Sequence, residues 1–340
     1  MVIRRASMFV ALIGAAAQLI ACHPAPETKA AVEAPVTEAN VTLPADVTSL
    51  TAINGSSSVV AGLADGRVAV WRAGGSPLLL RPHGVRVLAV GSTQDGTECW
   101  SLAADGSLAR TRLEAGAAST LQQIDLGAAP TRAAAFSSDG TVLVAGGGFG
   151  DVRVFDTATG TLRQTLRGHR TELQALAVRP GSAVVASASA EADLRIWDGA
   201  TGREISSAET DLSLFAVGFS PRDGTLASGG VDRRVTLRDA ATYASAGTFD
   251  LPAPLLVASL AWSPDGQWLA IGDVDDATLA KGGLRVVRAA TRDEVASLDT
   301  RGLPPSALTF VGDGRVLVGV VGRDLRAWAL PPQVTDTGAP

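Results

Sequence analysis

The side chains that most often perform chemistry in proteins are sparse in this 340-residue chain. Its histidines are His23, His83 and His169, and its cysteines are Cys22 and Cys99. The sequence has no HExxH pair, no closely spaced cysteine pair, no GxSxG turn and no GxxxxGKS/T loop, which are the spacings typical of zinc sites, nucleophiles and phosphate loops. We therefore predict no catalytic residue, no metal site and no cofactor.

One acidic cluster has the chemistry to bind a cation. Asp273, Asp275 and Asp276 place three carboxylates within four positions of an insertion at 272–283. Carboxylate oxygen is the ligand that calcium prefers, but the spacing lacks the glycine and the distal glutamate of an EF-hand. We favour a solvated loop tip over a calcium site, and the same loop could help to shape a binding surface.

Short strands joined by tight turns must position these residues. A turn signal at 137–140 precedes the apolar run 142–145. Residues 151–155 then alternate polar and apolar, which is the period of a half-buried strand. A further turn leads to a more polar strand at 162–166. Four such strands form a small sheet that cannot bury both faces alone, so we expect neighbouring copies.

Copies of this unit recur along the chain. With a period of roughly 40 to 50 residues, apolar third strands end at Trp71, Thr111, Phe155, Trp197, Arg238, Arg288 and Trp328. No stretch shows a sustained helical period. These observations predict an all-β fold of seven four-stranded antiparallel sheets, with almost no helix.

The repeated motifs resemble those of the WD-repeat (WD40) β-propeller family over residues 41–330. They are a Ser-Pro-Asp-Gly turn after Trp262, an Ala-Ser-Gly run at 227–229 and an Ile-Trp-Asp strand end at 196–198. The resemblance implies a seven-bladed propeller. It also implies that Trp71, Trp197 and Trp328 pack between blades.

The resemblance gives His169 a structural role, because it stands in the single Gly-His pair of the chain. In that family a His–Asp–Ser–Trp network links the turns of a blade. Glu191 occupies the position where the family's turn aspartate is expected. We therefore expect a weakened network, with packing holding most blades.

The two ends of the folded region predict how the ring closes. The seventh unit has three strands and stops at Pro331 and Pro332, whereas residues 40–43 form a spare strand before the first unit. Pairing the two removes an open sheet edge. We expect a propeller at 40–331, preceded by a signal peptide (1–21) and a disordered tether (22–39) and followed by a disordered tail (332–340).

The first residues have the features of an export signal. Arg4 and Arg5 precede the apolar stretch 8–20, which is too short to span a bilayer comfortably. The sequence Leu-Ile-Ala-Cys ending at Cys22 resembles the lipobox of bacterial lipoproteins, which implies lipidation of Cys22 after cleavage. An ordinary signal peptide or an uncleaved anchor is the alternative. His23 is not the aspartate that favours inner-membrane retention, so the resemblance favours the outer membrane of a Gram-negative cell envelope.

Charge limits the class of partner. The formal net charge is −5, and no basic stripe runs along the chain, so we expect no nucleic-acid partner. The membrane contact would be the lipid on Cys22, and the ring would be monomeric. Cys99 lies in an apolar stretch, and we predict that it is a small buried side chain of a strand.

These observations favour a non-enzymatic scaffold that binds protein partners, which is the usual role of the family that the chain resembles. A propeller enzyme, either quinoprotein dehydrogenase-like or lactonase-like, is the alternative, and a structural role in envelope assembly is a third reading. We expect binding on the face that carries the interblade connections and the second-to-third-strand loops. The residues predicted for that face are His83, Arg132, Arg170, Asp211, Arg233, Asp273, Asp275 and Asp276.

Overall fold

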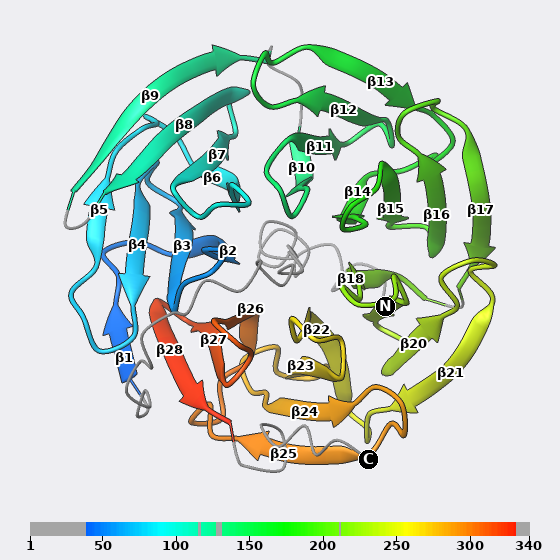
Figure 1. The fold of residues 1–340 in the computed structure, drawn as a ribbon. Coiled ribbons are helices and arrows are strands. Elements are labelled where there is room, and N and C mark those ends of the chain that lie inside the picture. Colours follow the sequence, from blue (N-terminus) through cyan, green and yellow to red (C-terminus); the bar gives the residue numbers. More distant parts are fainter. Residues whose placement is uncertain (1–38, 115–116, 127–130, 211, 331–340) are drawn as a thin grey trace.

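The chain forms a ring of seven four-stranded antiparallel sheets, which confirms the predicted propeller (Figure 1). The structure is a computed structural model and describes residues 39–114, 117–126, 131–210 and 212–330. No helix occurs within these ranges. None of the described segments is therefore a helix long and apolar enough to cross a membrane. The predicted signal peptide, Cys22, most of the tether and the tail lie outside the described residues.

Each blade runs from a strand near the ring axis to a strand at the periphery. The innermost strands are β2 (Val47–Ala52), β6 (Val87–Ser92), β10 (Thr131–Phe136), β14 (Leu173–Val178), β18 (Leu214–Phe219), β22 (Leu255–Trp262) and β26 (Pro305–Val311). The second strands are β3 (Ser58–Leu63), β7 (Glu98–Ala103), β11 (Val142–Gly147), β15 (Val184–Ser189), β19 (Leu226–Gly230), β23 (Trp268–Asp275) and β27 (Val316–Val321).

The outer half of each blade follows the same order. The third strands are β4 (Val68–Arg72), β8 (Ser107–Glu114), β12 (Val152–Asp156), β16 (Asp193–Asp198), β20 (Arg234–Arg238), β24 (Leu284–Arg288) and β28 (Asp324–Ala329). The outermost strands are β5 (Leu78–Leu80), β9 (Ala117–Asp125), β13 (Leu162–Leu166), β17 (Glu204–Glu209), β21 (Ser245–Asp250), β25 (Glu294–Leu298) and, in blade 7, β1 (Ala39–Thr42).

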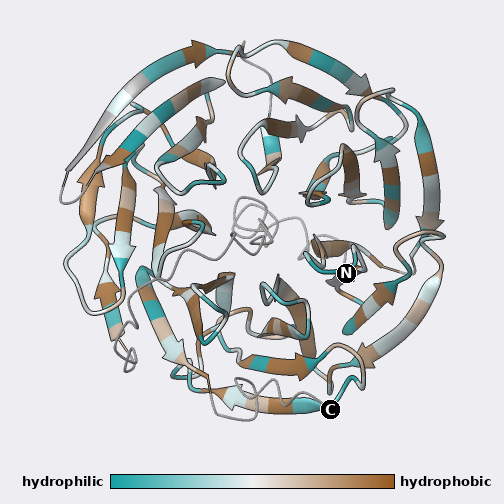
Figure 2. Cartoon of the chain, in the orientation of Figure 1, coloured by the Kyte–Doolittle hydropathy of each residue, from teal (hydrophilic) through white to brown (hydrophobic). Residues whose placement is uncertain are grey.

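Burial falls from the axis to the rim because inner strands are covered on both sides by neighbouring blades. Every residue of β14 is buried, whereas β17 alternates between half-buried and exposed residues. Figure 2 shows the corresponding change from mostly apolar inner strands to outer strands of alternating polarity. Function must therefore come from loops and edges, since the inner strands are occupied by packing.

The ring closes through its two ends, as the sequence predicted. β1 pairs antiparallel with β28, and Ala39 lies opposite Ala327. β1 begins at Ala39, one residue earlier than the predicted propeller boundary. Thr42 Oγ1 also donates a hydrogen bond of 2.6 Å to Asp324 Oδ1 across this junction.

Strand alternation gives the ring two faces with different loops. The linker face carries the interblade linkers, including 81–86, 167–172, 251–254 and 299–304, together with the second-to-third-strand turns at 64–67, 104–106, 148–151, 190–192, 231–233, 276–283 and 322–323. The hairpin face carries the other turns, at 53–57, 73–77, 93–97, 137–141, 157–161, 179–183, 199–203, 220–225, 239–244, 263–267, 289–293 and 312–315.

Glycine is required where a turn on the linker face presses against the next linker. Gly66 has φ +89°, and a Cβ at this position would lie 2.4 Å from the carbonyl oxygen of His83. Gly150 has φ +78°, and its Cβ would lie 2.6 Å from the carbonyl oxygen of His169. Both the backbone angle and the close approach exclude a side chain.

Candidate functional site

Blade 4 contains a complete hydrogen-bonded network on the linker-face side. His169, on linker 167–172, places Nε2 2.6 Å from Ser187 Oγ and Nδ1 2.9 Å from Asp193 Oδ2. Trp197 Nε1 donates to the same Ser187 Oγ at 2.8 Å. The network joins the linker to the second and third strands of the blade, so His169 helps to hold these segments together.

The carboxylate of this network is Asp193, and the prediction that Glu191 weakens the network is wrong for blade 4. Glu191 is exposed at the tip of turn 190–192. Asp193 stands two residues later, at the start of β16, where its carboxylate reaches both His169 and Arg195. Glu191 does not disrupt the network, because the carboxylate that bonds to His169 comes from the strand rather than from the turn.

A shorter version of this network surrounds His83, which was predicted for the partner-binding face and lies on linker 81–86 with its ring buried. His83 is only 4% exposed. Its Nδ1 lies 2.8 Å from Ser107 Oγ, and its Nε2 lies 2.8 Å from Ser101 Oγ. Ser107 Oγ donates in turn to Asp105 Oδ1 at 2.7 Å. Both ring nitrogens therefore bond within blade 2, and the ring is not presented to a partner.

Burial also decides the charge state of these two rings. Desolvation lowers the pKa of His83, although the negative charge of Asp105 opposes the shift. Desolvation likewise lowers the pKa of His169 against the opposing effect of Asp193. Both rings are consequently neutral at physiological pH and hydrogen-bonded at both nitrogens, which suits a structural bridge rather than an exposed general base.

The acidic insertion separates into three carboxylates with three different roles. Asp273, which was predicted for the partner-binding face, is only 1% exposed. Its Oδ1 accepts a hydrogen bond of 2.7 Å from the Gly283 amide, and its Oδ2 accepts one of 2.9 Å from Arg285 Nε. Asp273 therefore holds the base of the loop.

Of the other two carboxylates, Asp275 ends β23 and Asp276 begins turn 276–283. Asp275 Oδ1 accepts hydrogen bonds from the amides of Ala277 (3.1 Å) and Thr278 (2.7 Å), so it stabilises its own turn. Asp276 is exposed, and its amide donates to the Pro254 carbonyl at 3.0 Å. Among the described residues, no group of three or more histidine, cysteine, aspartate or glutamate side chains is arranged to hold a metal ion.

The remaining residues predicted for binding are spread over the linker face. Arg132, Arg170 and Arg233 are exposed. Arg132 Nε lies 3.0 Å from Glu172 Oε2, so its charge is partly matched within the chain. Asp211 lies outside the described residues. Arg132 thus contacts the linker that also carries Arg170, whereas Arg233 lies on turn 231–233 of blade 5.

The three tryptophans predicted to be structural are buried near the ends of third strands. Trp71 is 1% exposed and donates to the Gly75 carbonyl at 2.9 Å. Trp197 packs in one cluster with Val152 and Val154 of blade 3. Trp328 packs with residues of blade 6, and its Nε1 donates to the Asp299 carbonyl at 2.9 Å.

Sequence reasoning missed the apolar residues that the linker face exposes. Phe149 is 80% exposed at the tip of turn 148–151. Val85 (41%), Leu212 (43%) and Leu303 (42%) lie on interblade linkers of the same face. The signal for Phe149 was present in the sequence, because a lone aromatic residue between glycines cannot pack within its own strand.

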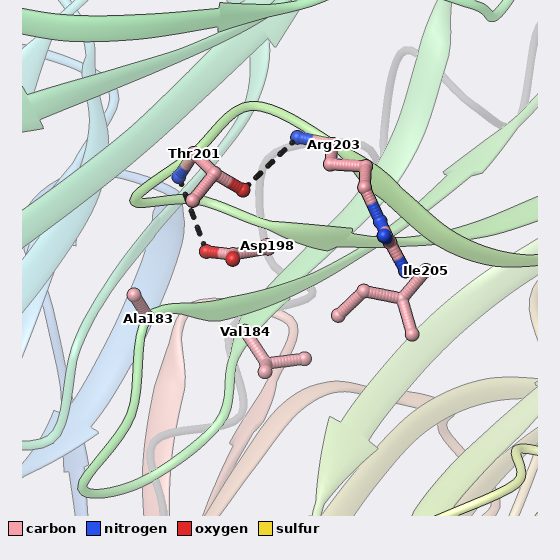
Figure 3. A pocket seen from close by; sticks show the side chains of 6 residues that line it. All are labelled: Ala183, Val184, Asp198, Thr201, Arg203 and Ile205. Atoms are coloured by element: carbon pink, nitrogen blue, oxygen red, sulfur yellow. Dashed lines mark hydrogen bonds between the residues drawn. The ribbon is translucent and has the colours of Figure 1, made fainter.

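A hollow on the hairpin face of blade 4 does not bring reactive groups together. It has a volume of about 500 Å³ and is lined by Ala183, Val184, Asp198, Thr201, Arg203 and Ile205 (Figure 3). The Asp198 carboxylate accepts a hydrogen bond of 3.2 Å from the Thr201 amide. The carboxylate therefore stabilises its own turn.

Cys99 is unsuited to nucleophilic chemistry. It is 1% exposed, and burial raises the pKa of its thiol to about 12. The thiolate is the reactive form of cysteine, so this residue is inert at neutral pH.

Comparison with known proteins identifies WD-type segments in the chain. Residues 160–198 and 248–279 match the family model described as WD domain, G-beta repeat. The first match contains His169, Asp193 and Trp197, and it ends at the last residue of β16.

Several WD-repeat proteins are similar to parts of the chain. It is 32% identical over 128 residues to WD repeat-containing protein VIP3 of Arabidopsis thaliana, covering 34% of this chain and 40% of that protein. It is 27% identical over 239 residues to Echinoderm microtubule-associated protein-like 2 of Rattus norvegicus, covering 68% of this chain and 36% of that protein.

A third relative, WD repeat and HMG-box DNA-binding protein 1 of Xenopus laevis, is 28% identical over 159 residues, covering 43% of this chain and 14% of that protein. The matches thus span less than half of each of these three relatives. The seven-bladed propeller of this chain contains WD40-type repeat segments and has relatives among WD-repeat proteins.

Proposed function

We propose that this protein is a non-enzymatic scaffold whose linker face binds a protein partner. One observation carries the proposal. Among the described residues, large apolar side chains that are exposed on loops occur only on the linker face, at Val85, Phe149, Leu212 and Leu303. The other exposed large apolar residues, Leu79, Leu162 and Ile205, lie on outermost strands.

The distribution of these residues indicates a broad contact. They come from linkers and turns of different blades, so a partner that touches all four must lie across the face rather than against one blade. Exposed aromatic residues are frequent anchors of protein interfaces, whereas charged residues around them form a polar rim. Arg132, Arg170, Arg233 and Asp276 would supply that rim.

Phe149 provides the sharpest test of this face. Replacing Phe149 with Ala should weaken binding of the native partner by tenfold or more, since truncating an interface anchor costs about 2 kcal/mol. Leu162→Ala is the matched control, because Leu162 is 49% exposed but lies on outer strand β13. Partners crosslinked in intact envelopes would be identified first, and their affinities for both variants then measured.

The melting temperature should stay nearly unchanged in both variants. Equal affinities of Phe149→Ala and the unaltered protein, together with a partner footprint on the hairpin face, would contradict the assignment of the linker face.

The proposal includes an exported, monomeric propeller anchored by lipid on Cys22, in the outer membrane of a Gram-negative envelope. Its support is the Arg4–Arg5 pair, the apolar stretch and the Leu-Ile-Ala-Cys sequence. Two or three acyl chains would give stable anchoring that one chain does not. Cys22→Ser should release the protein from membranes and remove the acyl mass. Membrane retention with unchanged mass would contradict the anchor.

The alternative of a propeller enzyme gains no specific support from the described residues. The two histidines within the described residues, His83 and His169, bond to serine hydroxyls of separate blades. The relatives are named as WD-repeat and microtubule-associated proteins. A structural role in envelope assembly remains compatible with partner binding, and the identity of the captured partner distinguishes a dedicated complex from such a role.

A further inference from the structure

A groove on the hairpin face lies at the seam between blades 5 and 6, away from the linker face. Its volume is about 440 Å³. Turn 220–225 of blade 5 forms one side, and turns 263–267 and 289–293 of blade 6 contribute to the other. Its lining includes Leu237, Ala246, Trp262, Arg222, Arg288 and Arg292.

The apolar part of the lining is fixed in place. Trp262 Nε1 donates a hydrogen bond of 3.0 Å to the Gly218 carbonyl of the neighbouring blade. Leu237 and Trp262 belong to the same buried cluster, which joins blades 5, 6 and 7. Leu237 (9% exposed) and Trp262 (4% exposed) form an apolar floor of the groove, and the exposed Ala246 lines it beside them.

The polar part of the lining is strongly cationic. Arg222, Arg288 and Arg292 are exposed, and within the described chain none of them forms an ion pair at salt-bridge distance. The guanidinium of Arg288 lies 4.7 Å from the centre of the Trp268 ring, which limits its motion. The groove therefore presents three guanidinium groups, none of which forms a salt bridge within the described residues.

Asp223 supplies the carboxylate of the groove. Its Oδ1 accepts a hydrogen bond of 3.0 Å from the Thr225 amide, so part of its charge is used within turn 220–225. Arg222 also interacts electrostatically with Asp223. Three arginines against one aspartate leave an excess positive charge of two among these lining residues.

The adjacent seam shows that arginines on this face need not be available to a ligand. Arg179, between blades 4 and 5, donates through one guanidinium nitrogen to the Ala240 carbonyl at 3.1 Å. Its other terminal nitrogen donates to the Asp223 carbonyl at 3.4 Å. That guanidinium joins two blades, whereas no such backbone bonds fix the guanidinium groups of Arg222, Arg288 and Arg292 among the described residues.

We propose that the groove between blades 5 and 6 binds an acidic peptide segment that carries an aliphatic residue between its carboxylates. Guanidinium groups bind carboxylates through paired, charge-assisted hydrogen bonds. The surface of Leu237, Ala246 and Trp262 would cover the aliphatic side chain. The site is separate from the linker face, so the scaffold would hold two segments on opposite faces.

Nucleic acid fits the same groove less well. Binding a phosphate backbone requires an extended positive surface, and the chain as a whole has a formal charge of −5. An isolated cluster of three arginines beside apolar residues matches a short peptide better than a polyanion.

The proposal can be tested with two fluorescein-labelled heptapeptides. The acidic probe is Gly-Asp-Glu-Leu-Asp-Glu-Gly, and the neutral probe is Gly-Asn-Gln-Leu-Asn-Gln-Gly. Fluorescence anisotropy in 50 mM salt should show saturable binding of the acidic probe with a Kd below 1 mM, and binding of the neutral probe should be at least tenfold weaker.

The variant Arg222→Gln/Arg292→Gln should weaken acidic-probe binding about tenfold, which corresponds to the loss of charge-assisted contacts. Arg203→Gln is the matched control, because Arg203 is exposed on the same face but lies in blade 4. Its Kd should stay within about twofold of the unaltered protein. Thermal melting would establish that both variants are folded.

Three results would overturn the proposal. They are no binding of the acidic probe up to 1 mM, equal affinity for the two probes, and equal losses in Arg203→Gln and the double variant. Competition by a random-sequence 20-base-pair DNA duplex at a lower concentration than the acidic peptide would assign the groove to nucleic acid instead.

Discussion

Blades 4 and 6 build the same arginine clamp from different parts of the sequence. In blade 4, Arg195 Nε donates to Asp193 at 2.8 Å and its terminal nitrogen donates to Glu204 at 2.6 Å. In blade 6, Arg285 makes the corresponding bonds to Asp273 at 2.9 Å and to Glu294 at 2.7 Å. The two arginines are almost equally exposed, at 23% and 22% of their side chains.

The difference lies in which strand provides the inner carboxylate. Leu194 pairs with Ala188, and Leu284 pairs with Gly272, so Asp193 of blade 4 corresponds to Gly283 of blade 6. Blade 6 instead takes its carboxylate from β23, at Asp273. The clamp therefore requires a carboxylate at a point in space, and either neighbouring strand can deliver it.

This difference also changes what the carboxylate does. Asp193 bonds to His169 and remains 18% exposed, whereas Asp273 bonds to a loop amide and is only 1% exposed. The second arrangement anchors a longer loop, because the Asp273 bond to the Gly283 amide closes the base of turn 276–283. Blade 6 gains an insertion without losing its clamp.

The largest effect should come from removing the buried carboxylate of blade 6. Asp273→Ala should destabilise the fold by about 3 kcal/mol, since it leaves a partly buried guanidinium and a loop amide without their partner. Asp193→Ala should cost about 1 to 2 kcal/mol because its carboxylate is less buried. Urea unfolding of both variants measures the difference, and equal losses would remove the distinction between the two blades.

Histidine should make blade 4 sensitive to pH in a way that blade 6 is not. Burial lowers the pKa values of His169 and His83 in the folded state, so the unfolded chain takes up protons at higher pH. The stability that the two neutral histidines contribute is fully present above the ordinary histidine pKa of about 6.5. It is lost as the pH falls towards their lowered pKa values in the folded state. The melting temperature should therefore fall between pH 7.5 and 5.5.

The variant His83→Gln/His169→Gln tests this sign. It should be less stable at pH 7.5, by about 2 kcal/mol for the lost buried hydrogen bonds, and its stability should depend less on pH in the same interval. An unchanged pH slope would show that other groups control the acid sensitivity. His169→Gln in the Asp193→Ala background should cost less than in the unaltered protein, because the two residues are bonded.

The outer carboxylates of the two clamps should contribute little, and equally, to the stability of the fold. Glu204 and Glu294 are each 34% exposed at their side chains. Glu204→Gln and Glu294→Gln should each cost about 0.5 kcal/mol, as expected for partly exposed ion pairs. A markedly larger loss in either variant, measured by urea unfolding, would show that the clamps differ at both ends.

The smallest effect is expected at the exposed tip of the blade 6 loop. Asp276→Ala should change the free energy of unfolding by less than about 0.5 kcal/mol, because the exposed side chain can be lost without creating a cavity. Addition of calcium should leave the melting temperature unchanged, since the three carboxylates of the insertion do not converge. A calcium-dependent rise in melting temperature would contradict this description.

The sequence predicted the architecture well because the fold repeats its own signals. Turn residues, alternating strands and third-strand ends recur at similar spacing, so an ambiguous unit is resolved by its neighbours. The closing strand was predictable as well, since the last unit lacked an outer strand and residues 40–43 supplied one. The Ala39–Ala327 pairing confirms this reading.

Individual polar residues were harder to predict because strand pairing, rather than local composition, decides their burial. Asp273 looked like part of a charged loop, yet β23 runs to Asp275 and keeps it inside the blade. His83 lacked a Gly-His pair, so nothing local indicated that serines of β7 and β8 would surround it. The groove between blades 5 and 6 was not predictable, since it combines residues that only packing brings together.

The pairing of β1 with β28 has a consequence for the order of folding. Every other strand pair joins neighbours in the sequence, whereas this pair joins Ala39 to Ala327 across almost the whole described chain. Contacts between such distant segments are entropically costly to form and slow folding. Closure of the ring must therefore await synthesis of the seventh blade, so a ribosome-bound chain that ends before β28 cannot close its ring. The same junction makes the completed ring cooperative, because opening at this pair frees both ends of the repeat array at once.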